Sequence, residues 1–223
     1  MKKIPDRKIK LVVCDLDGTL LDTLEDLADS MNSVLARLGF PTHGEEAYKY
    51  FIGEGMENLV RRALPEPARG EPATVARCLG SMREEYGRRW KMRSKPYEGI
   101  PELLDILAER RIEMAVLSNK PDDFTKSMVA ELLPGHPFAV VLGERPSVPR
   151  KPDPAAAVEI ALRLRIPPAE FLYLGDTSID MITACAAGMF AVGALWGFRE
   201  ADELMAHGAR KLLSSPIQLL ELL

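Results

Sequence analysis

The chain has 223 residues, of which 47% are hydrophobic and 28% charged, the composition of an ordinary globular protein. Its formal net charge of −4 offers no basic field for a nucleic acid or an anionic membrane. No apolar stretch is long enough to span a bilayer. The length suits one large domain, or a core domain with a smaller second one.

The amino terminus and the cysteines favour a cytoplasmic protein. The first seven residues, MKKIPDR, lack the apolar run of a signal peptide. Cys14, Cys78 and Cys185 are odd in number, far apart and without the C-x-x-C spacing of a metal site. We therefore expect a cytoplasmic chain. From its charge we expect it to bind neither nucleic acid nor membranes, and we expect a monomer or a homodimer.

Residues 11–22, LVVCDLDGTLLD, are the most informative segment. An apolar, β-branched run is followed by Asp15 and Asp17, and Gly18 predicts a tight turn after a buried strand. Side chains at i and i+2 of a strand project to the same side, so the two carboxylates should lie together. Adjacent carboxylates repel each other unless a metal or a proton intervenes. A common Asp-Gly turn would explain Gly18 but not the preceding aspartate, which indicates a site.

Helical patterns fill residues 22–91, where no convincing strand occurs. Asp22 and Glu25 have the spacing of a capping box, and Gly39 is a plausible helix end. Periodicity predicts helices over 24–38, 56–64 and 73–91, with a Pro/Gly-rich link over 65–72.

From residue 95 onward, apolar strands alternate with helices. Asp153 is the expected cap of one helix, with Pro154 in its first turn. Continuous apolar strands indicate a parallel sheet covered by helices on both faces. The fold class is therefore α/β, a Rossmann-like three-layer core formed by 1–21 and 92–223, with the helical block 22–91 inserted. Strands are expected over 112–117, 138–142, 171–174, 190–195 and 210–213, and helices over 101–110, 121–133, 199–207 and 216–222 and after residues 153 and 178.

Polar side chains follow four of these strands. In open α/β sheets ligands bind beyond the carboxyl ends of the strands, so these residues should meet at one rim. Each alone could be a turn residue, a solvated lysine or a helix-cap acid, but four in succession indicate one site. They are Asp15 and Asp17, Ser118 and Asn119, Lys151 in the loop after the third strand, and Asp176 with Asp180.

The chemistry of this set is coherent. Several carboxylates in one crevice need a cation, and oxygen ligands without nearby Cys or His favour Mg²⁺ over zinc. Lys151 supplies a positive charge, and Ser118 with backbone N–H groups can hold oxyanions. A carboxylate nucleophile, a metal and these donors suit attack on phosphorus.

These residues resemble all four motifs of the haloacid dehalogenase superfamily, in order and spacing over nearly the whole chain. The resemblance implies that Asp15 is the nucleophile that forms an aspartyl-phosphate. It implies that Asp17 protonates the leaving group and then deprotonates the attacking water, and this acid argues against dehalogenase activity. The matching segments are Asp15-Leu-Asp-Gly-Thr19, Ser118-Asn119, Lys151-Pro152 and Gly175-Asp-Thr-Ser-Ile-Asp180.

The same resemblance implies the remaining roles. Residues 22–91 would be a cap over the site. The phosphoryl group would be bound by Ser118 and Lys151, with Thr19 and Asn119 as further substrate contacts. Mg²⁺ would be held by the Asp15 carboxylate, the Asp17 carbonyl and Asp176, with Asp180 supporting the metal directly or through water.

Within the superfamily, residues 175–188, 194–198 and 118–121 resemble phosphoglycolate phosphatases, which more often carry Thr at position 118. The expected substrate is a small phosphorylated metabolite, foremost 2-phosphoglycolate. In the cap, Gly53 and Gly55 precede a helix and can present N–H groups to a substrate carboxylate. Glu54 would oppose such an anion unless Arg61 or Arg62 compensates it, and an ordinary loop is the competing interpretation.

Other functions stay open on the sequence alone. A β-phosphoglucomutase-like enzyme shares the core but needs a cap Arg and Lys, for which Arg61 and Lys49 are candidates. A pyrophosphatase, a nucleotidase and a phosphatase of broad specificity are further alternatives, although 6% aromatic residues offer little for base stacking. A non-catalytic module would be expected to lack a motif residue, and none is missing.

Overall fold

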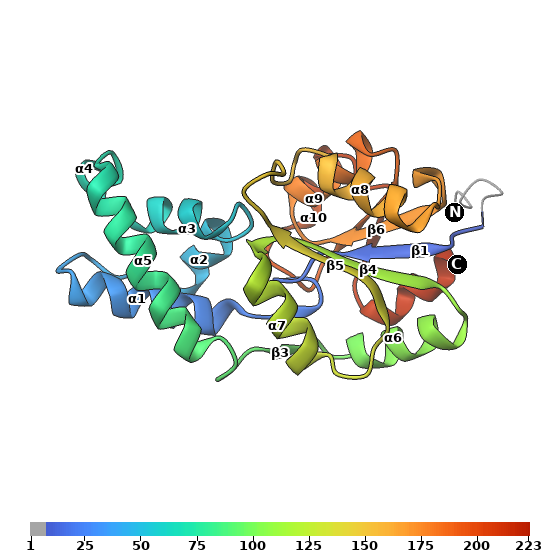
Figure 1. Cartoon of the computed structure of the whole chain (residues 1–223), viewed down its shortest axis with the longest axis horizontal. Coiled ribbons are helices and arrows are strands. Elements are labelled where there is room, and N and C mark those ends of the chain that lie inside the picture. Colours follow the sequence, from blue (N-terminus) through green and yellow to red (C-terminus); the bar gives the residue numbers. More distant parts are fainter. Residues whose placement is uncertain (1–7) are drawn as a thin grey trace. The chain divides into compact units, whose positions relative to one another are not determined.

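The computed structural model describes residues 8–223, which form two compact units. The core unit comprises Pro96–Leu223 and the amino-terminal segment that ends at Leu21, and the helical unit is Asp22–Lys95 (Figure 1). The expectations about a signal peptide and about the start of the core concern residues 1–7, which lie outside the described part. Within residues 8–223, no helix has the length and apolar character needed to cross a membrane.

The core unit is built on a six-stranded parallel sheet in the order β5-β4-β1-β6-β7-β8. The chain adds β4 and β5 on one side of β1 and then crosses to add β6, β7 and β8 on the other. The strand order therefore reverses at β1, and a ligand site is expected beyond its carboxyl end. The strands are β1 (Leu11–Cys14), β4 (Glu113–Pro121), β5 (Phe138–Glu144), β6 (Phe171–Gly175), β7 (Phe190–Ala194) and β8 (Lys211–Leu213).

Helices cover both faces of this sheet, which confirms the predicted three-layer α/β core (Figure 1). Alternate residues of a strand point to opposite faces, and in β1 both sets are apolar and buried. Leu11 and Val13 join one core cluster with Ile160 and Met181. One face is covered by α8 (Ala155–Leu164), α9 (Ser178–Ala186) and α10 (Ala201–Ala206), and the other by α6 (Ile100–Glu109) and α7 (Asp122–Leu132).

The register of the sheet places the polar residues at one edge. Cys14, the last residue of β1, pairs with Val116 of β4 and Leu174 of β6. The N–H of Asp15 then donates to the carbonyl of Leu174 at 3.0 Å. Asp15 and Asp176 therefore leave neighbouring strands at nearly the same level.

Strand β4 extends further than the predicted 112–117. It continues to Pro121, whose partner in β5 is Glu144 after a register shift. Ser118 and Asn119 consequently lie within the strand rather than after it. The predicted strand ended at residue 117 because the residues that follow are polar. Periodicity cannot distinguish a polar strand end from a loop.

The helical unit holds five helices, of which α1 and α5 pack against each other. Their buried faces include Met31 and Val34 of α1 and Met82 and Tyr86 of α5. The seven-residue α2 and the four-residue α4 were not predicted, because so few residues show no clear periodicity. The helices are α1 (Leu24–Arg37), α2 (Glu45–Phe51), α3 (Met56–Ala63), α4 (Glu66–Arg69) and α5 (Pro72–Arg89).

Two segments join the units, and they pair as the short strands β2 (Leu21–Asp22) and β3 (Lys95–Pro96). The return to the core unit falls at Pro96 rather than at residue 92. Residues 93–94 stay with the helical unit because the buried carboxylate of Asp26 accepts three hydrogen bonds from them. The donors are the N–H groups of Arg93 and Ser94 and the hydroxyl of Ser94.

Three predicted helix ends differ in the structure. The capping box of Asp22 and Glu25 is wrong: Thr23 is the N-cap of α1, and no side chain caps it. The N-cap of α8 is Pro154, although Asp153 accepts a hydrogen bond from the N–H of Ala155 at 2.8 Å. The last helix, Pro216–Leu222, is a 3₁₀-helix.

Candidate active site

Three buried carboxylates meet beyond the carboxyl ends of β1 and β6. Asp15, Asp176 and Asp180 each place one carboxylate oxygen within 4.8 Å of the others. Asp15 is 5% exposed, and the other two are fully buried. Their convergence follows from adjacent parallel strands, with Asp180 one helical turn beyond Asp176.

A single buried ammonium group, that of Lys151, lies among these carboxylates. Its Nζ is 2.9 Å from Asp15 Oδ1 and 2.7 Å from Asp180 Oδ1, and it donates to the carbonyl of Leu117 at 3.0 Å. A lysine ammonium has three donors, so all three are accounted for. Lys151 therefore links the residue after β1, the middle of β4 and the first turn of α9.

Asp176 is held by hydrogen bonds from two other loops. The hydroxyl of Thr19 donates to Oδ1 at 2.7 Å, and the N–H of Phe198 donates to Oδ2 at 2.9 Å. The indole N–H of Trp196 donates to the carbonyl of Thr19 at 2.9 Å. Thr19, which was predicted to contact substrate, thus orients a carboxylate in this structure.

Asp180 belongs to the first turn of α9, where it completes a capping box with Thr177. Its Oδ2 accepts the hydroxyl of Thr177 at 2.7 Å and the N–H of Thr177 at 3.1 Å, while Oδ1 faces Lys151. Both oxygens are therefore engaged by the protein. Asp180 thereby holds both Lys151 and the start of α9 next to the other two carboxylates.

Two glycines allow the backbone to approach these carboxylates closely. Gly18 has a φ of +82°, and a Cβ there would collide with the carboxylate of Asp176. A Cβ on Gly175 would collide with the side chain of Asp180. The Asp-Gly and Gly-Asp pairs of the motifs are therefore steric requirements of the site.

Burial strongly perturbs the titration of this cluster. Desolvation raises the pKa of Asp15 from 3.8 to about 7, with Lys151 opposing and Asp180 adding to the effect. Burial, followed by the charges of Asp180 and Asp15, raises the pKa of Asp176 well above its ordinary value. Burial alone would lower the pKa of Lys151, but Asp15 and Asp180 raise it well above the usual value.

The donor set fits Mg²⁺. Three carboxylates against one ammonium leave an excess of two negative charges when all four groups are ionised. The ligating atoms are oxygens, which Mg²⁺ prefers, and the cluster contains no Cys or His. A divalent cation there would offset the mutual repulsion of the carboxylates, which adds to the effect of burial in raising the pKa values of Asp15 and Asp176.

Ser118 and Asn119 are both buried in β4 and differ in what they contact. The hydroxyl of Ser118 accepts the N–H of Lys120 at 3.2 Å. The amide of Asn119 forms two 2.9 Å hydrogen bonds with the backbone of Lys151, one from its Nδ2 and one to its Oδ1. Asn119, predicted to contact substrate, thus fixes the backbone that carries Lys151.

Asp17 contacts a residue that the sequence did not single out. The Nζ of Lys120 donates to Asp17 Oδ1 at 2.9 Å and to Oδ2 at 3.1 Å. Strand periodicity could have indicated Lys120, because it lies two residues after Ser118 on the same strand. The contact of Thr177 with Asp180 also had a local signal, the Thr-x-x-Asp spacing of a capping box, whereas the contact of the Phe198 N–H had none.

In the helical unit, Gly53 and Gly55 both have positive φ, 115° and 88°, and Gly55 is the N-cap of α3. Glu54 between them pairs with Arg62, whose guanidinium also donates to the carbonyl of Tyr50 at 2.7 Å. The negative charge of this loop is therefore compensated, as one of the predicted alternatives required.

The two residues considered for a mutase are engaged within the helical unit. Lys49 pairs with Glu46 at 2.9 Å, and Arg61 pairs with Glu57 at 2.7 Å. Both pairs are between residues one turn apart on the same helix. These contacts do not favour the mutase alternative.

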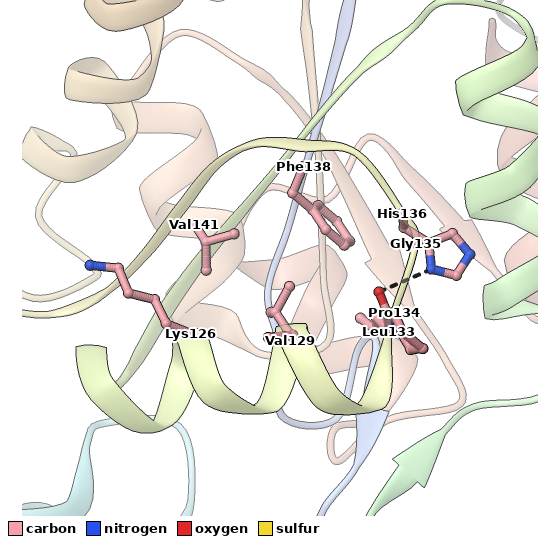
Figure 2. A pocket seen from close by; sticks show the side chains of 9 residues that line it. Lys126, Val129, Leu133, Pro134, Gly135, His136, Phe138 and Val141 are labelled. Atoms are coloured by element: carbon pink, nitrogen blue, oxygen red, sulfur yellow. Dashed lines mark hydrogen bonds between the residues drawn. The ribbon is translucent and has the colours of Figure 1, made fainter.

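A pocket of about 250 Å³ between α7 and β5 has different chemistry (Figure 2). Its lining is mostly apolar, including Val129, Phe138 and Val141, and it contains no carboxylate. His136 at one end is hydrogen bonded through Nδ1 to the carbonyl of Leu133 at 3.2 Å. This pocket therefore lacks the cluster of carboxylates that lies beyond β1 and β6.

Known proteins share this sequence and fold. The model of the haloacid dehalogenase-like hydrolases matches residues 12–194. A phosphoglycolate phosphatase of Pseudomonas putida is 33% identical over 201 residues, which are 89% of this chain and 74% of that protein. A phosphoglycolate phosphatase of Thiobacillus denitrificans is 35% identical over 190 residues, 84% of this chain and 83% of that one.

The solved structures agree. A protein of Lactobacillus delbrueckii subsp. bulgaricus, provisionally named a phosphoglycolate phosphatase, has a TM-score of 0.89 and 30% identity over 96% of this chain and 98% of its own. The sequence motifs, the parallel sheet and the buried acidic cluster all agree with these matches. The chain therefore belongs to the haloacid dehalogenase-like hydrolases and is a phosphatase.

Proposed function

We propose that this phosphatase is a Mg²⁺-dependent phosphomonoester hydrolase that acts through an aspartyl-phosphate, with 2-phosphoglycolate as its substrate. The observation that carries the proposal is the cluster of Asp15, Asp176 and Asp180 around Lys151. The names of the relatives support the choice of substrate.

In the first step, a carboxylate oxygen of Asp15 attacks phosphorus as the ester P–O bond breaks. The departing oxygen takes a proton from the carboxyl group of Asp17. In the second step Asp17 removes a proton from water, the water oxygen attacks phosphorus, and the carboxylate of Asp15 leaves. Inorganic phosphate is formed and both aspartates return to their starting states.

Other side chains hold the reacting group. The ammonium of Lys151, whose contact with Asp15 is released when that carboxylate attacks phosphorus, and the hydroxyl of Ser118 bind phosphoryl oxygens and offset the negative charge that gathers on them. Mg²⁺, held by Asp15, Asp176 and the carbonyl of Asp17, supplies further charge neutralisation when it is bound. Asp180 and Asn119 keep Lys151 in place.

The helical unit supplies the choice of substrate in this proposal. The loop of Gly53 and Gly55 presents backbone N–H groups to the carboxylate of the substrate. The pairing of Glu54 with Arg62 supports this role, because it offsets the one acidic side chain of the loop.

The test is phosphate release from a panel of esters, with Mg²⁺ and with EDTA. The panel contains 2-phosphoglycolate, sugar phosphates, nucleotides and pyrophosphate. We expect Mg²⁺-dependent release that is fastest on 2-phosphoglycolate and falls by at least about 10⁴-fold in Asp15→Asn, since the amide is no nucleophile. Asp105→Asn, a change at a largely exposed position of α6, is the matched control.

Full activity of Asp15→Asn would exclude the aspartyl-phosphate. Equal rates on many esters would keep the hydrolase and exclude 2-phosphoglycolate as its particular substrate. Phosphate release that persists in EDTA would exclude the metal.

A further inference from the structure

Lys120 is a second buried lysine of the core unit, and the proposed steps do not use it. Its side chain is 3% exposed, and that of its partner Asp17 is 11% exposed. The ammonium contacts both carboxylate oxygens, at 2.9 and 3.1 Å. The pair joins β4 to the loop after β1, 103 positions apart in the sequence.

Hydrogen bonds hold the backbone of Lys120, and they fix the position from which its side chain extends. Its N–H donates to the hydroxyl of Ser118 at 3.2 Å, and its carbonyl accepts the hydroxyl of Thr125 at 3.1 Å. Ser118 lies on the same strand, and Thr125 is buried in the first turn of α7. Lys120 lies on a strand and is hydrogen bonded to a helix, so its side chain is positioned more precisely than one on a loop would be.

The two buried lysines divide the aspartates of the first motif between them. Lys151 contacts Asp15, and its other donors are taken by Asp180 and Leu117. Lys120 contacts Asp17. Burying an ammonium is costly unless it is paired, so each lysine requires its carboxylate to stay where the structure has it.

We infer that Lys120 is a positioning residue that orients the carboxyl group of Asp17 towards the leaving-group oxygen. The inference rests on the proposed function, in which Asp17 is the general acid. A general acid must lie within about 2.6–3.2 Å of the oxygen that it protonates. Two contacts from one ammonium restrict rotation of the carboxyl group, which a single contact would allow.

In this role Lys120 neither gives nor takes a proton. The proton moves from Asp17 to the ester oxygen as that oxygen leaves phosphorus and the bond from Asp15 forms. Misplacing Asp17 therefore slows only the departure of leaving groups that need a proton. Alkoxides need one, whereas 2,4-dinitrophenolate leaves as a stable anion.

The experiment compares two esters in Lys120→Met, namely 2-phosphoglycolate and 2,4-dinitrophenyl phosphate, with Mg²⁺ present. Release of the leaving group is followed in the first turnover, because later turnovers also need Asp17 as a base. We expect a 10²–10³-fold loss on the alkyl ester and less than about a threefold loss on the aryl ester, as expected from loss of general acid catalysis. Lys120→Arg, which keeps two donors, should recover at least about tenfold on the alkyl ester.

Lys126→Met is the matched control, because Lys126 is a half-exposed lysine of α7 that pairs with Asp122. It should leave both rates unchanged. Circular dichroism and the melting temperature check that each variant is folded. If Lys120→Met does not fold, Lys120→Gln, which replaces the ammonium with a shorter, neutral amide, must show the same selective loss on the alkyl ester.

Equal losses on the two esters in a folded variant would overturn the inference, because a merely structural role slows both. Unchanged rates on both would overturn it as well. Failure of the proposed function is distinct, since the wild-type protein would then hydrolyse neither ester in a Mg²⁺-dependent way.

Discussion

The aspartates of this site are buried and carry more negative charge than the one lysine among them compensates, so the site favours a cation. The three carboxylates share one lysine, and burial raises the pKa of Asp15 to about 7. A carboxyl group with a raised pKa destabilises the folded state when it ionises. The metal-free protein should therefore lose stability as the pH rises from about 4 towards 7, where the unfolded state has already released this proton.

The same shift predicts that Mg²⁺ and protons compete at Asp15. A metal ligand must be deprotonated, and a group with a pKa of about 7 is about ten times less ionised at pH 6 than at pH 8. We expect the affinity for Mg²⁺ to be at least about tenfold weaker at pH 6, as measured by calorimetric titration. In Asp15→Asn this pH dependence should diminish, and an affinity that is equal at the two pH values in the wild type would contradict the prediction.

At the scale of elements, most active-site groups lie on strands, directly after them or at a helix end, and Lys151 alone of those named comes from the longer loop between β5 and α8. Asp15 and Asp176 follow β1 and β6, Lys120 belongs to β4, and Asp180 lies in the first turn of α9. Such elements hold side chains with less freedom than loops do. In the helical unit, a charged side chain is also held on a helix: Glu85 of α5 contacts three arginines, namely Arg37, Arg88 and Arg89.

Glu85 makes the stability of the helical unit dependent on pH. Its hydrogen bond with Arg89 lowers its pKa below the ordinary 4.5. A lowered pKa means that the ionised group stabilises the fold above pH 4.5, and that this contribution is lost as the pH falls through the lowered value. Glu85→Gln should therefore cost about 1 kcal/mol at pH 7 and almost nothing in strong acid.

Amide hydrogen exchange across α5 measures this cost, since α5 is where Glu85 and two of its partners lie. Glu84→Gln, at the exposed neighbouring position of the same helix, is the control. A loss of protection that is the same at pH 7 and at acid pH would show that the ion pairs are not the cause.

At the scale of the whole molecule, the proposed chemistry and the proposed selectivity reside in different units. The carboxylates and both buried lysines belong to the core unit, and the loop of Gly53 and Gly55 belongs to the helical unit. Substitutions in the loop should therefore change which ester is used without changing how phosphorus is attacked.

Gly55→Ala tests this division. Gly55 has a φ of 88°, which an alanine adopts at a cost of about 1–2 kcal/mol, so the loop should shift. We expect KM for 2-phosphoglycolate to rise about tenfold, the equivalent of 1.4 kcal/mol. Hydrolysis of 2,4-dinitrophenyl phosphate, which has no carboxylate, should change little.

Gly39→Ala is the matched control, because Gly39 also has a positive φ, 78°, and belongs to the same unit. Steady-state kinetics on both esters gives the comparison. If Gly55→Ala and Gly39→Ala behave alike, the loop has no part in recognising the carboxylate.

Much of this protein was predictable from its sequence because the relevant patterns are local. Continuous apolar runs predicted the parallel sheet, and Asp15 with Asp17 marked the site through the i, i+2 geometry of a strand. The order and spacing of the four motifs were sufficient to identify the resemblance to the superfamily. Short helices such as α2 (Glu45–Phe51) and the polar end of β4 escaped, because they leave no apolar period.

Only the tertiary structure decided which groups touch. The pairs of Lys120 with Asp17, of Asn119 with the backbone of Lys151, and of the Phe198 N–H with Asp176 join segments far apart in the chain. Such contacts depend on strand register and on which backbone groups reach the site. Neither can be predicted from the pattern of neighbouring residues in the sequence. The sequence by itself determined the residue types that gather at the sheet edge, and folding determined how the charges among them are shared.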